Sequence, residues 1–142
     1  MKNKELPTTI RVVLADDHDL VRSGIKALLA MIAGVEVIAE AHDGRELVTL
    51  VESLQPDVVM TDISMPGMDG IAAITEIHSK FPEVRLLVLS MYDTVDFVKR
   101  AVANGACGYL MKDAPPFELE QALRSVMATG SYFSPTIAQR LL

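Results

Sequence analysis

The sequence predicts an α/β fold in which five parallel strands form an open, doubly wound sheet with the order 2-1-3-4-5. Short apolar runs recur along the chain at regular intervals, and several, such as residues 86–89, are apolar at consecutive positions. Strands that are covered on both faces have this pattern, which is typical of parallel sheets. The stretches between the runs have helical spacing, and strands alternating with helices imply right-handed crossovers. Five such units are too few for an eight-stranded barrel, which leaves the open sheet.

The predicted strands are the five apolar runs, at residues 10–15, 35–39, 58–61, 84–89 and 107–111. Each predicted helix has an apolar face and is followed by a glycine or proline that ends it. The faces are formed by Leu20, Ile25, Leu28, Leu29 and Ile32; by Leu47, Leu50, Val51 and Leu54; by Ile71, Ile74 and Ile77; by Val95, Val98, Ala101 and Val102; and by Leu119, Leu123, Val126 and Met127. The residues that end them are Gly34, Pro56, Pro82, Gly105 and Gly130.

Local signals support two helix starts. Asp43 and Glu46 have the spacing of a capping box, so the second helix is expected to begin there. Ser134 followed by Pro135 has the pattern of an N-cap and a first helical residue. This last helix either docks on the domain or leads toward a further domain that has been removed, and the second alternative is favoured. We therefore expect a disordered extension at 1–8, a folded domain at 9–130, and the start of a linker at 131–142.

The composition of the chain argues against several classes of function. The chain has 142 residues, half of them hydrophobic, and a net charge of -6. An acidic chain is a poor nonspecific binder of nucleic acid, because that binding needs basic side chains against phosphates. No apolar run approaches the ~18 residues that a membrane span needs, and the first residues lack the pattern of a secretory signal. The single cysteine, Cys107, fits a reducing compartment, so a cytoplasmic location is expected.

Three carboxylates are predicted to meet at one edge of the sheet. Asp16 and Asp17 follow the first strand, and Asp62 follows the third. In open α/β sheets ligands bind beyond the carboxyl ends of the strands, where the strand order reverses, here between strands 1 and 3. Clustered carboxylates repel one another, and a hard divalent cation removes that cost. The expected cofactor is therefore Mg²⁺ (or Mn²⁺).

Two further side chains point to phosphoryl transfer. Ser90 follows the fourth strand and Lys112 follows the fifth, so both are expected at the same edge. A hydroxyl donates to a phosphoryl oxygen, and an ammonium pairs with phosphoryl charge. A carboxylate can act as the nucleophile and form an aspartyl phosphate, and Asp62, alone at the end of the central strand, is the best candidate.

These residues resemble those of a response-regulator receiver domain of a two-component system. The signature comprises Asp16-Asp17, the run TDISMPGMDG at 61–70, Ser90, and the run YLMK at 109–112. The resemblance covers about residues 9 to 130 and implies a flavodoxin-like (βα)5 fold. The sequence around these motifs is similar to that of the NarL/FixJ group, whose members usually continue into a LuxR-type helix-turn-helix domain. No such domain is present in this sequence, so DNA binding is expected only through an absent C-terminal domain.

The resemblance implies a role for each site residue. Asp62 is expected to be the phosphoacceptor, and Asp17, Asp62 and the backbone carbonyl of Ser64 to bind the metal directly. Asp16 is expected to act through a coordinated water. Ser90 and Lys112 would hold the phosphoryl group, and Tyr109 would be a switch that turns inward as Ser90 moves. His18, beside the acidic pair, is interpreted as a helix-start residue rather than a ligand, because Mg²⁺ prefers oxygen.

One residue departs from the family pattern. Receivers usually have proline after the lysine, often with a cis peptide bond, whereas Asp113 follows Lys112 here. Because a cis bond before a residue other than proline costs about 3 kcal/mol, the Lys112–Asp113 bond is predicted to be trans.

The expected function is a signalling switch. A sensor histidine kinase would donate a phosphoryl group to Asp62, and phosphorylation would promote a homodimer and control the DNA-binding domain. The domain is not expected to be an enzyme beyond catalysing its own phosphorylation and dephosphorylation. The alternatives are a receiver-like interaction module that is never phosphorylated, a flavodoxin-like cofactor binder, and an aspartate-nucleophile phosphatase. The phosphatase would need a second aspartate where Ser64 stands, and the cofactor binder a phosphate loop where the acidic run 16–19 stands.

Overall fold

The structure is a computed structural model that describes residues 9–142, and within them six strands alternate with six helices. In chain order the elements are β1 (Ile10–Ala15), α1 (Asp19–Ala30), β2 (Val35–Ala41), α2 (Gly44–Leu54), β3 (Val58–Thr61), α3 (Gly70–Lys80), β4 (Arg85–Ser90), α4 (Val95–Ala103), β5 (Gly108–Met111), α5 (Pro116–Ala128), β6 (Tyr132–Phe133) and α6 (Pro135–Arg140). The extension predicted at 1–8 lies outside the described residues. None of the helices in the described part has the length and apolar character to cross a membrane.

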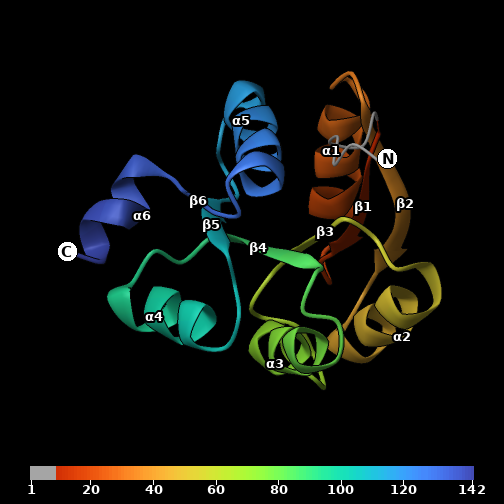
Figure 1. Ribbon diagram of the computed structural model, residues 1–142, viewed down its shortest axis with the longest axis horizontal. Coiled ribbons are helices and arrows are strands. Elements are labelled where there is room, and N and C mark those ends of the chain that lie inside the picture. Colours follow the sequence, from red (N-terminus) through yellow and green to blue (C-terminus); the bar gives the residue numbers. More distant parts are fainter. Residues whose placement is uncertain (1–8) are drawn as a thin grey trace, which may run out of the picture.

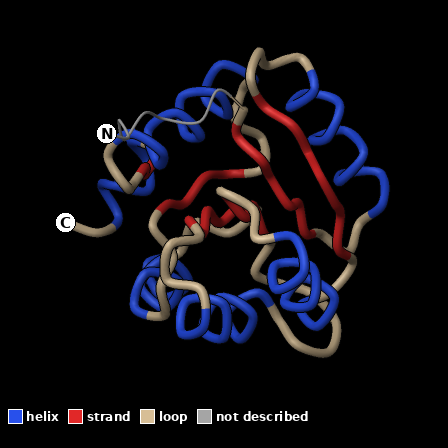
Figure 2. The backbone as a smooth tube through the Cα atoms, turned by 45° about the vertical axis from the view of Figure 1, so that its right-hand side comes forward, coloured by secondary structure: helices blue, strands red, loops and turns tan. Residues whose placement is uncertain are grey.

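All six strands run parallel in one sheet with the order β2-β1-β3-β4-β5-β6 (Figure 1). The predicted order 2-1-3-4-5 is confirmed, and β6 adds a strand at the edge of β5. In Figure 2 the strands lie at the centre of the molecule and helices surround them. The strands are almost wholly buried from β3 to β5, as their consecutive apolar residues predicted.

The sheet separates two apolar layers. One layer packs α1 and α5 against one face of the sheet, and it includes Leu29, Leu110 and Leu123. The other packs α2, α3 and α4 against the opposite face, and it includes Ile74 and Tyr109. Figure 1 shows the two groups of helices on opposite sides of the strands. Helices on both faces are what a doubly wound sheet requires.

The predicted apolar faces are largely buried, with errors in α4, where Val95 and Val102 are each 39% exposed, and in α1. Leu20 was expected to face the core but is 87% exposed, whereas Arg22 is only 7% exposed. The reason is helical geometry: Arg22, Ile25 and Leu29 are spaced by three and four residues and share a face, and Leu20 does not. The buried face of α1 therefore begins with a charged residue.

The N-cap predicted for α2 is confirmed. The side chain of Asp43 accepts a hydrogen bond from the N–H of Glu46 at 2.8 Å. The reciprocal half of a capping box is displaced by one residue, because the Glu46 carboxylate accepts from the N–H of His42 at 2.7 Å. The first bond satisfies an N–H group that a helix start leaves unpaired, and the second satisfies the N–H of the residue before the cap.

The C-terminal segment packs against the domain. Tyr132 and Phe133 pair with Gly108 and Tyr109 of β5, and Ile137 of α6 is fully buried in the layer that contains Tyr109. The structure thus shows this segment docked on the domain. A strand of two residues is too short to produce an apolar pattern, so the sixth strand could not be predicted.

Gln55, at the end of α2, has a left-handed backbone with φ of 47°. A side chain in this conformation costs about 1 kcal/mol or more, and glycine avoids that cost. Gln55→Gly is therefore expected to raise the free energy of unfolding by about 0.5 kcal/mol, after the greater freedom of glycine in the unfolded chain is subtracted. Urea denaturation measures the change. Gln55→Ala, which keeps the strained backbone, is the matched control, and equal stability of the two variants would contradict this account.

Candidate functional site

The predicted site residues lie at the carboxyl edge of the sheet. Asp16 directly follows β1 and Asp62 directly follows β3, and these two strands are neighbours. Ser90 is the last residue of β4, and Lys112 directly follows β5. The backbone N–H of Lys112 donates to the carbonyl of Ser90 at 2.9 Å, which holds these two strand ends together. Residues far apart in the sequence thus converge because parallel strands end at the same edge.

Lys112 connects the carboxylates of Asp16 and Asp62. Its Nζ lies 2.7 Å from Oδ2 of Asp16 and 2.9 Å from Oδ2 of Asp62. The three side chains are 8%, 2% and 5% exposed, respectively, so the charges are nearly removed from water. Burial alone would lower the pKa of Lys112, but the bonds to the two carboxylates outweigh burial and raise it. The ammonium therefore stays charged at the position where the sequence predicts a phosphoryl group.

The backbone fixes the orientation of the Asp62 carboxylate. Its Oδ1 accepts hydrogen bonds from the N–H groups of Ile63 at 2.7 Å and Ser64 at 3.3 Å. Ser64, which the resemblance implies as a carbonyl ligand, therefore lies next to the carboxylate in an exposed loop. The turn after β3 holds the predicted nucleophile in place without a side-chain partner on this oxygen.

The carboxylate cluster has the donor set that a hard divalent cation requires. Ligand atoms of Asp16, Asp17, His18 and Asp62 all lie within 4.8 Å of one another. Oδ1 of Asp17 is shielded from solvent and has no hydrogen-bond partner. A buried, unpaired carboxylate oxygen is costly unless a cation compensates it. Because carboxylates are also the ligands that Mg²⁺ prefers, these residues fit a magnesium ion.

His18 occupies the N-cap position of α1, as the helix-start interpretation expected. Its Nδ1 lies 3.3 Å from Oδ1 of Asp16 and 3.1 Å from Oδ1 of Asp17, although the ring is mostly exposed. The contact with Asp17 lacks the geometry of a hydrogen bond, so it leaves that oxygen unsatisfied.

Ser90 and Tyr109 are both completely buried. The Ser90 hydroxyl accepts a hydrogen bond from the N–H of Tyr92 at 3.0 Å, and α4 begins only at Val95, so Ser90 is not a helix cap. The Tyr109 hydroxyl donates to the backbone carbonyl of Tyr92. Burial raises the pKa of Tyr109, a contact with Ser90 lowers it by less, and the charges of Asp62 and Asp93 raise it. The ring is therefore in the inward position that the resemblance associates with the switch.

Pockets open on both sides of the carboxylate cluster. One, of about 420 Å³, is lined by Asp17, Ser64, Arg100 and neighbouring residues. The other, of about 310 Å³, is lined by Val21, Met91, Met111, Lys112 and Asp113. Both pockets thus adjoin predicted site residues.

The peptide bond predicted after Lys112 is confirmed. The described residues contain no cis peptide bond, so the Lys112–Asp113 bond is trans as predicted. Replacing the usual proline with Asp113 has not prevented Lys112 from reaching the carboxylates.

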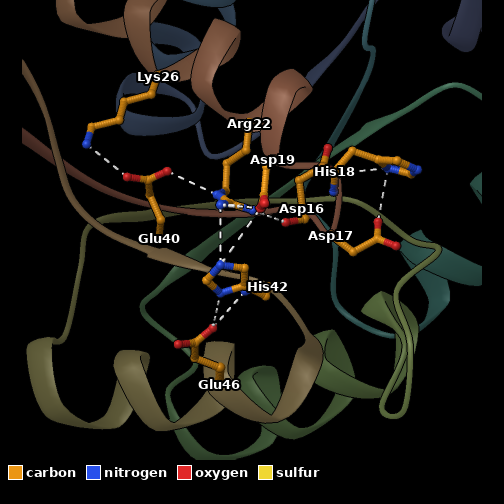
Figure 3. Close-up of polar contacts among 9 residues, drawn as sticks. All are labelled: Asp16, Asp17, His18, Asp19, Arg22, Lys26, Glu40, His42 and Glu46. Carbon is orange, nitrogen blue, oxygen red and sulfur yellow. Dashed lines mark hydrogen bonds and ion pairs between the residues drawn. The ribbon is translucent and has the colours of Figure 1, made fainter.

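Sequence analysis missed one group beside the site. The guanidinium of Arg22 contacts Asp19, Glu40 and His42, and it also donates to the backbone carbonyl of Asp16 (Figure 3). The sequence feature that could have identified Arg22 is the helical face that it shares with Ile25 and Leu29, because this spacing places a charged residue among buried ones. An arginine that is 7% exposed must find acceptors, and it finds them around residues 16–19, here called the acidic loop.

The comparisons with known proteins agree with this geometry. The profile of the family described as "Response regulator receiver domain" matches residues 12–124. The chain is 38% identical to the transcriptional regulatory protein DegU of Brevibacillus brevis over 133 residues, which are 94% of this chain and 56% of DegU. It is 40% identical to the response regulator GacA of Pseudomonas aeruginosa over 132 residues, which are 93% of this chain and 62% of GacA. The chain thus spans less than two thirds of the length of these relatives.

A solved structure gives the same result. The LuxR-family two-component response regulator from Aurantimonas sp. SI85-9A1 superposes with a TM-score of 0.89 at 37% identity. The match covers 94% of this chain and 95% of that one, so the two share the fold over nearly their whole described length.

Proposed function

This chain belongs to the receiver-domain family of two-component response regulators, of the LuxR/NarL type, and from that premise we propose that it accepts one phosphoryl group on Asp62 in a Mg²⁺-dependent reaction. The observation that carries the proposal is the ammonium of Lys112 held between Asp16 and Asp62 at 2.7 and 2.9 Å. A cation buried beside the nucleophile is placed to pair with the charge of a transferred phosphoryl group.

The chain's own residues supply most of the proposed mechanism. The N–H groups of Ile63 and Ser64 orient the carboxylate of Asp62, one of whose oxygens attacks phosphorus as the bond to the leaving group breaks. Lys112 and the hydroxyl of Ser90 then hold the transferred group. Asp17, Asp62 and the carbonyl of Ser64 would hold Mg²⁺ directly, and Asp16 would hold it through water. The bound ion would neutralise the carboxylates and the phosphoryl oxygens.

The phosphoryl donor in the cell is proposed to be the phosphohistidine of a sensor histidine kinase. Phosphorylation would draw Ser90 toward the phosphoryl group and so release its bond to Tyr92, next to the carbonyl that binds Tyr109. We propose that this couples the site to homodimerisation and, in a cytoplasmic full-length regulator, to a DNA-binding domain. The domain would turn over nothing but its own phosphorylation and dephosphorylation.

Intact mass after incubation with acetyl phosphate and Mg²⁺ tests the proposal. One added phosphoryl group is expected on the native chain, and none on Asp62→Asn or in the presence of a chelator. Because some receivers accept only from their kinase, a parallel titration with beryllofluoride, which mimics the acyl phosphate, is needed. Failure of the native chain in both experiments would overturn the proposal in favour of an interaction module that is never phosphorylated. Turnover of a small phosphoester would instead indicate a phosphatase.

A further inference from the structure

The side chain of Arg22 joins segments on three sides of the acidic loop. From α1 it donates to Oδ1 of Asp19 at 2.8 Å and, across the sheet edge, to Oε1 of Glu40 in β2 at 3.0 Å. Its Nη2 also lies 3.3 Å from Nε2 of His42, whose Nδ1 is 2.9 Å from the Glu46 carboxylate (Figure 3). An arginine fork can serve several acceptors in fixed directions, which a lysine cannot.

The shortest of these bonds goes to the backbone of the site. Nη1 of Arg22 donates to the carbonyl of Asp16 at 2.7 Å, and this bond is buried. The N–H of Asp16 is held from the other side by the carbonyl of Ala41 in β2 at 3.1 Å. The carbonyl of Asp16 belongs to the peptide that links Asp16 to Asp17. Arg22 thus fixes the plane of the one peptide between the two carboxylates.

Asp17 depends on that peptide more than its neighbours do. Lys112 holds the carboxylate of Asp16, and Lys112 and two N–H groups hold that of Asp62. Oδ1 of Asp17, in contrast, is buried without a hydrogen-bond partner. Among the described residues, its one side-chain contact is with Nδ1 of the mostly exposed His18 at 3.1 Å, which lacks the geometry of a hydrogen bond, so its position depends chiefly on its backbone.

We propose that Arg22 is a positioning residue for the cation site, which acts by holding the Asp16–Asp17 peptide so that the carboxylate of Asp17 faces the cluster. The inference rests on the proposed Mg²⁺-dependent function and extends it to a residue outside the carboxylate cluster. Groups that orient metal ligands from behind change metal affinity by roughly 10- to 100-fold when they are removed.

The direction in which Mg²⁺ affinity changes when Arg22 is removed distinguishes a positioning role from a purely electrostatic one. Arg22 is a cation near a cation site, so its removal alone would make the site more negative and strengthen Mg²⁺ binding. Loss of the peptide anchor has the opposite effect, since the unsupported Asp17 would no longer be held in place. Weaker Mg²⁺ binding after Arg22 is removed can therefore not be attributed to the lost charge.

The neighbouring residues provide matched controls. Glu40→Gln weakens the ion pairs of Arg22 and Lys26 but leaves the contact with the Asp16 carbonyl in place. Lys26→Met removes an exposed cation that contacts Glu40 at 2.8 Å and does not contact the acidic loop. A purely structural role for the network predicts that Glu40→Gln and Arg22→Met change Mg²⁺ binding in parallel.

The experiment is a calorimetric titration with Mg²⁺ on the full chain and its variants, with folding checked by urea denaturation in chelator. Arg22→Met is expected to bind Mg²⁺ at least about 10-fold more weakly than the native chain, and Glu40→Gln and Lys26→Met within about twofold of it. If Arg22→Met does not fold, Arg22→Gln, which keeps polar groups at the buried position but is too short for the carbonyl, replaces it with the same expectation. Unchanged or tighter binding by the Arg22 variant, or an equal loss in Glu40→Gln, would overturn the inference. Absence of Mg²⁺ binding by the native chain would instead reject the proposed function.

Discussion

Lys112→Met is expected to lower the free energy of unfolding, measured in chelator, by about 3–5 kcal/mol, the usual result of removing one partner from a buried ion pair. Methionine has nearly the length of lysine but no charge, so the carboxylates of Asp16 and Asp62 would remain buried at 2% and 5% exposure without their shared cation. Phosphorylation of Asp62 should also become much slower, because no ammonium would remain to pair with the phosphoryl charge.

Mg²⁺ and pH provide two checks on this account. Saturating Mg²⁺ should restore part of the lost stability to Lys112→Met, since a ligand that binds only the folded state stabilises it. In the native chain the pKa of Lys112 is raised above its ordinary 10.5, so its stabilising effect is fully present below that value and is lost as the pH rises through the raised pKa. The difference in free energy of unfolding between the native chain and Lys112→Met should therefore become smaller as the pH is raised through this pKa.

The control for Lys112→Met is Lys26→Met, which breaks an exposed ion pair and should cost at most about 1 kcal/mol. Equal losses in the two variants would show that the ammonium between Asp16 and Asp62 contributes no more than a surface charge does.

Gly70→Ala is expected to disturb the phosphoacceptor directly. A Cβ at this position would lie 2.0 Å from the carbonyl oxygen of Asp62 and 2.8 Å from the Cα of Ile63, which are backbone atoms that no side-chain rotation can move aside. The N–H of Gly70 also donates to the carbonyl of Ile63 at 2.8 Å, so α3 starts in contact with the loop. The loop must shift, at a cost of about 3 kcal/mol in stability. A misplacement of about 1 Å costs roughly 100-fold in rate, so the phosphorylation rate should fall by that order.

Gly24→Ala is the matched control for Gly70→Ala. Gly24 lies on the exposed side of α1, and a Cβ there would have no atom within 4 Å. Alanine is the better helix former, so this variant should gain about 1 kcal/mol and phosphorylate at the native rate. Urea denaturation and the rate of phosphoryl incorporation from acetyl phosphate distinguish the two variants. A Gly70→Ala protein with native stability and a native phosphorylation rate would show that the loop after β3 accommodates the added Cβ without cost.

The fold was largely predictable because the strands of a parallel sheet have a strong pattern. The bounds predicted for β1 and β3 agree with the structure, those of β2 and β5 differ by two and one residues at one end, and those of β4 differ by one residue at both ends. The convergence of Asp16, Asp62 and Lys112 also followed from sequence, since it depends only on strand order and on the edge at which parallel strands end. Neither result needed knowledge of side-chain packing.

The remaining features depend on contacts that no local pattern records. The bond of Arg22 to the carbonyl of Asp16 requires the exact turn of α1 against β2, and the sequence suggests only that a charge shares a face with Ile25. The docking of Ile137 depends on its packing in the layer that contains Val98 of α4 and Tyr109 of β5, which are distant in sequence. Leu20 was misplaced because its apolar character was given more weight than its helical angle.

The two layers on either side of the sheet determine where a change at the site can be transmitted. Tyr109 and Leu110 are consecutive in β5 and point to opposite faces: Tyr109 lies in the layer with Val98 and Ile137, and Leu110 lies in the layer of α1 and α5. A rotation of Tyr109 would repack the first layer and leave the second as a fixed frame. If Tyr109 acts as the proposed switch, the layer of α2, α3 and α4 would respond to phosphorylation and the layer of α1 and α5 would not, and α6 packs on the layer that would respond.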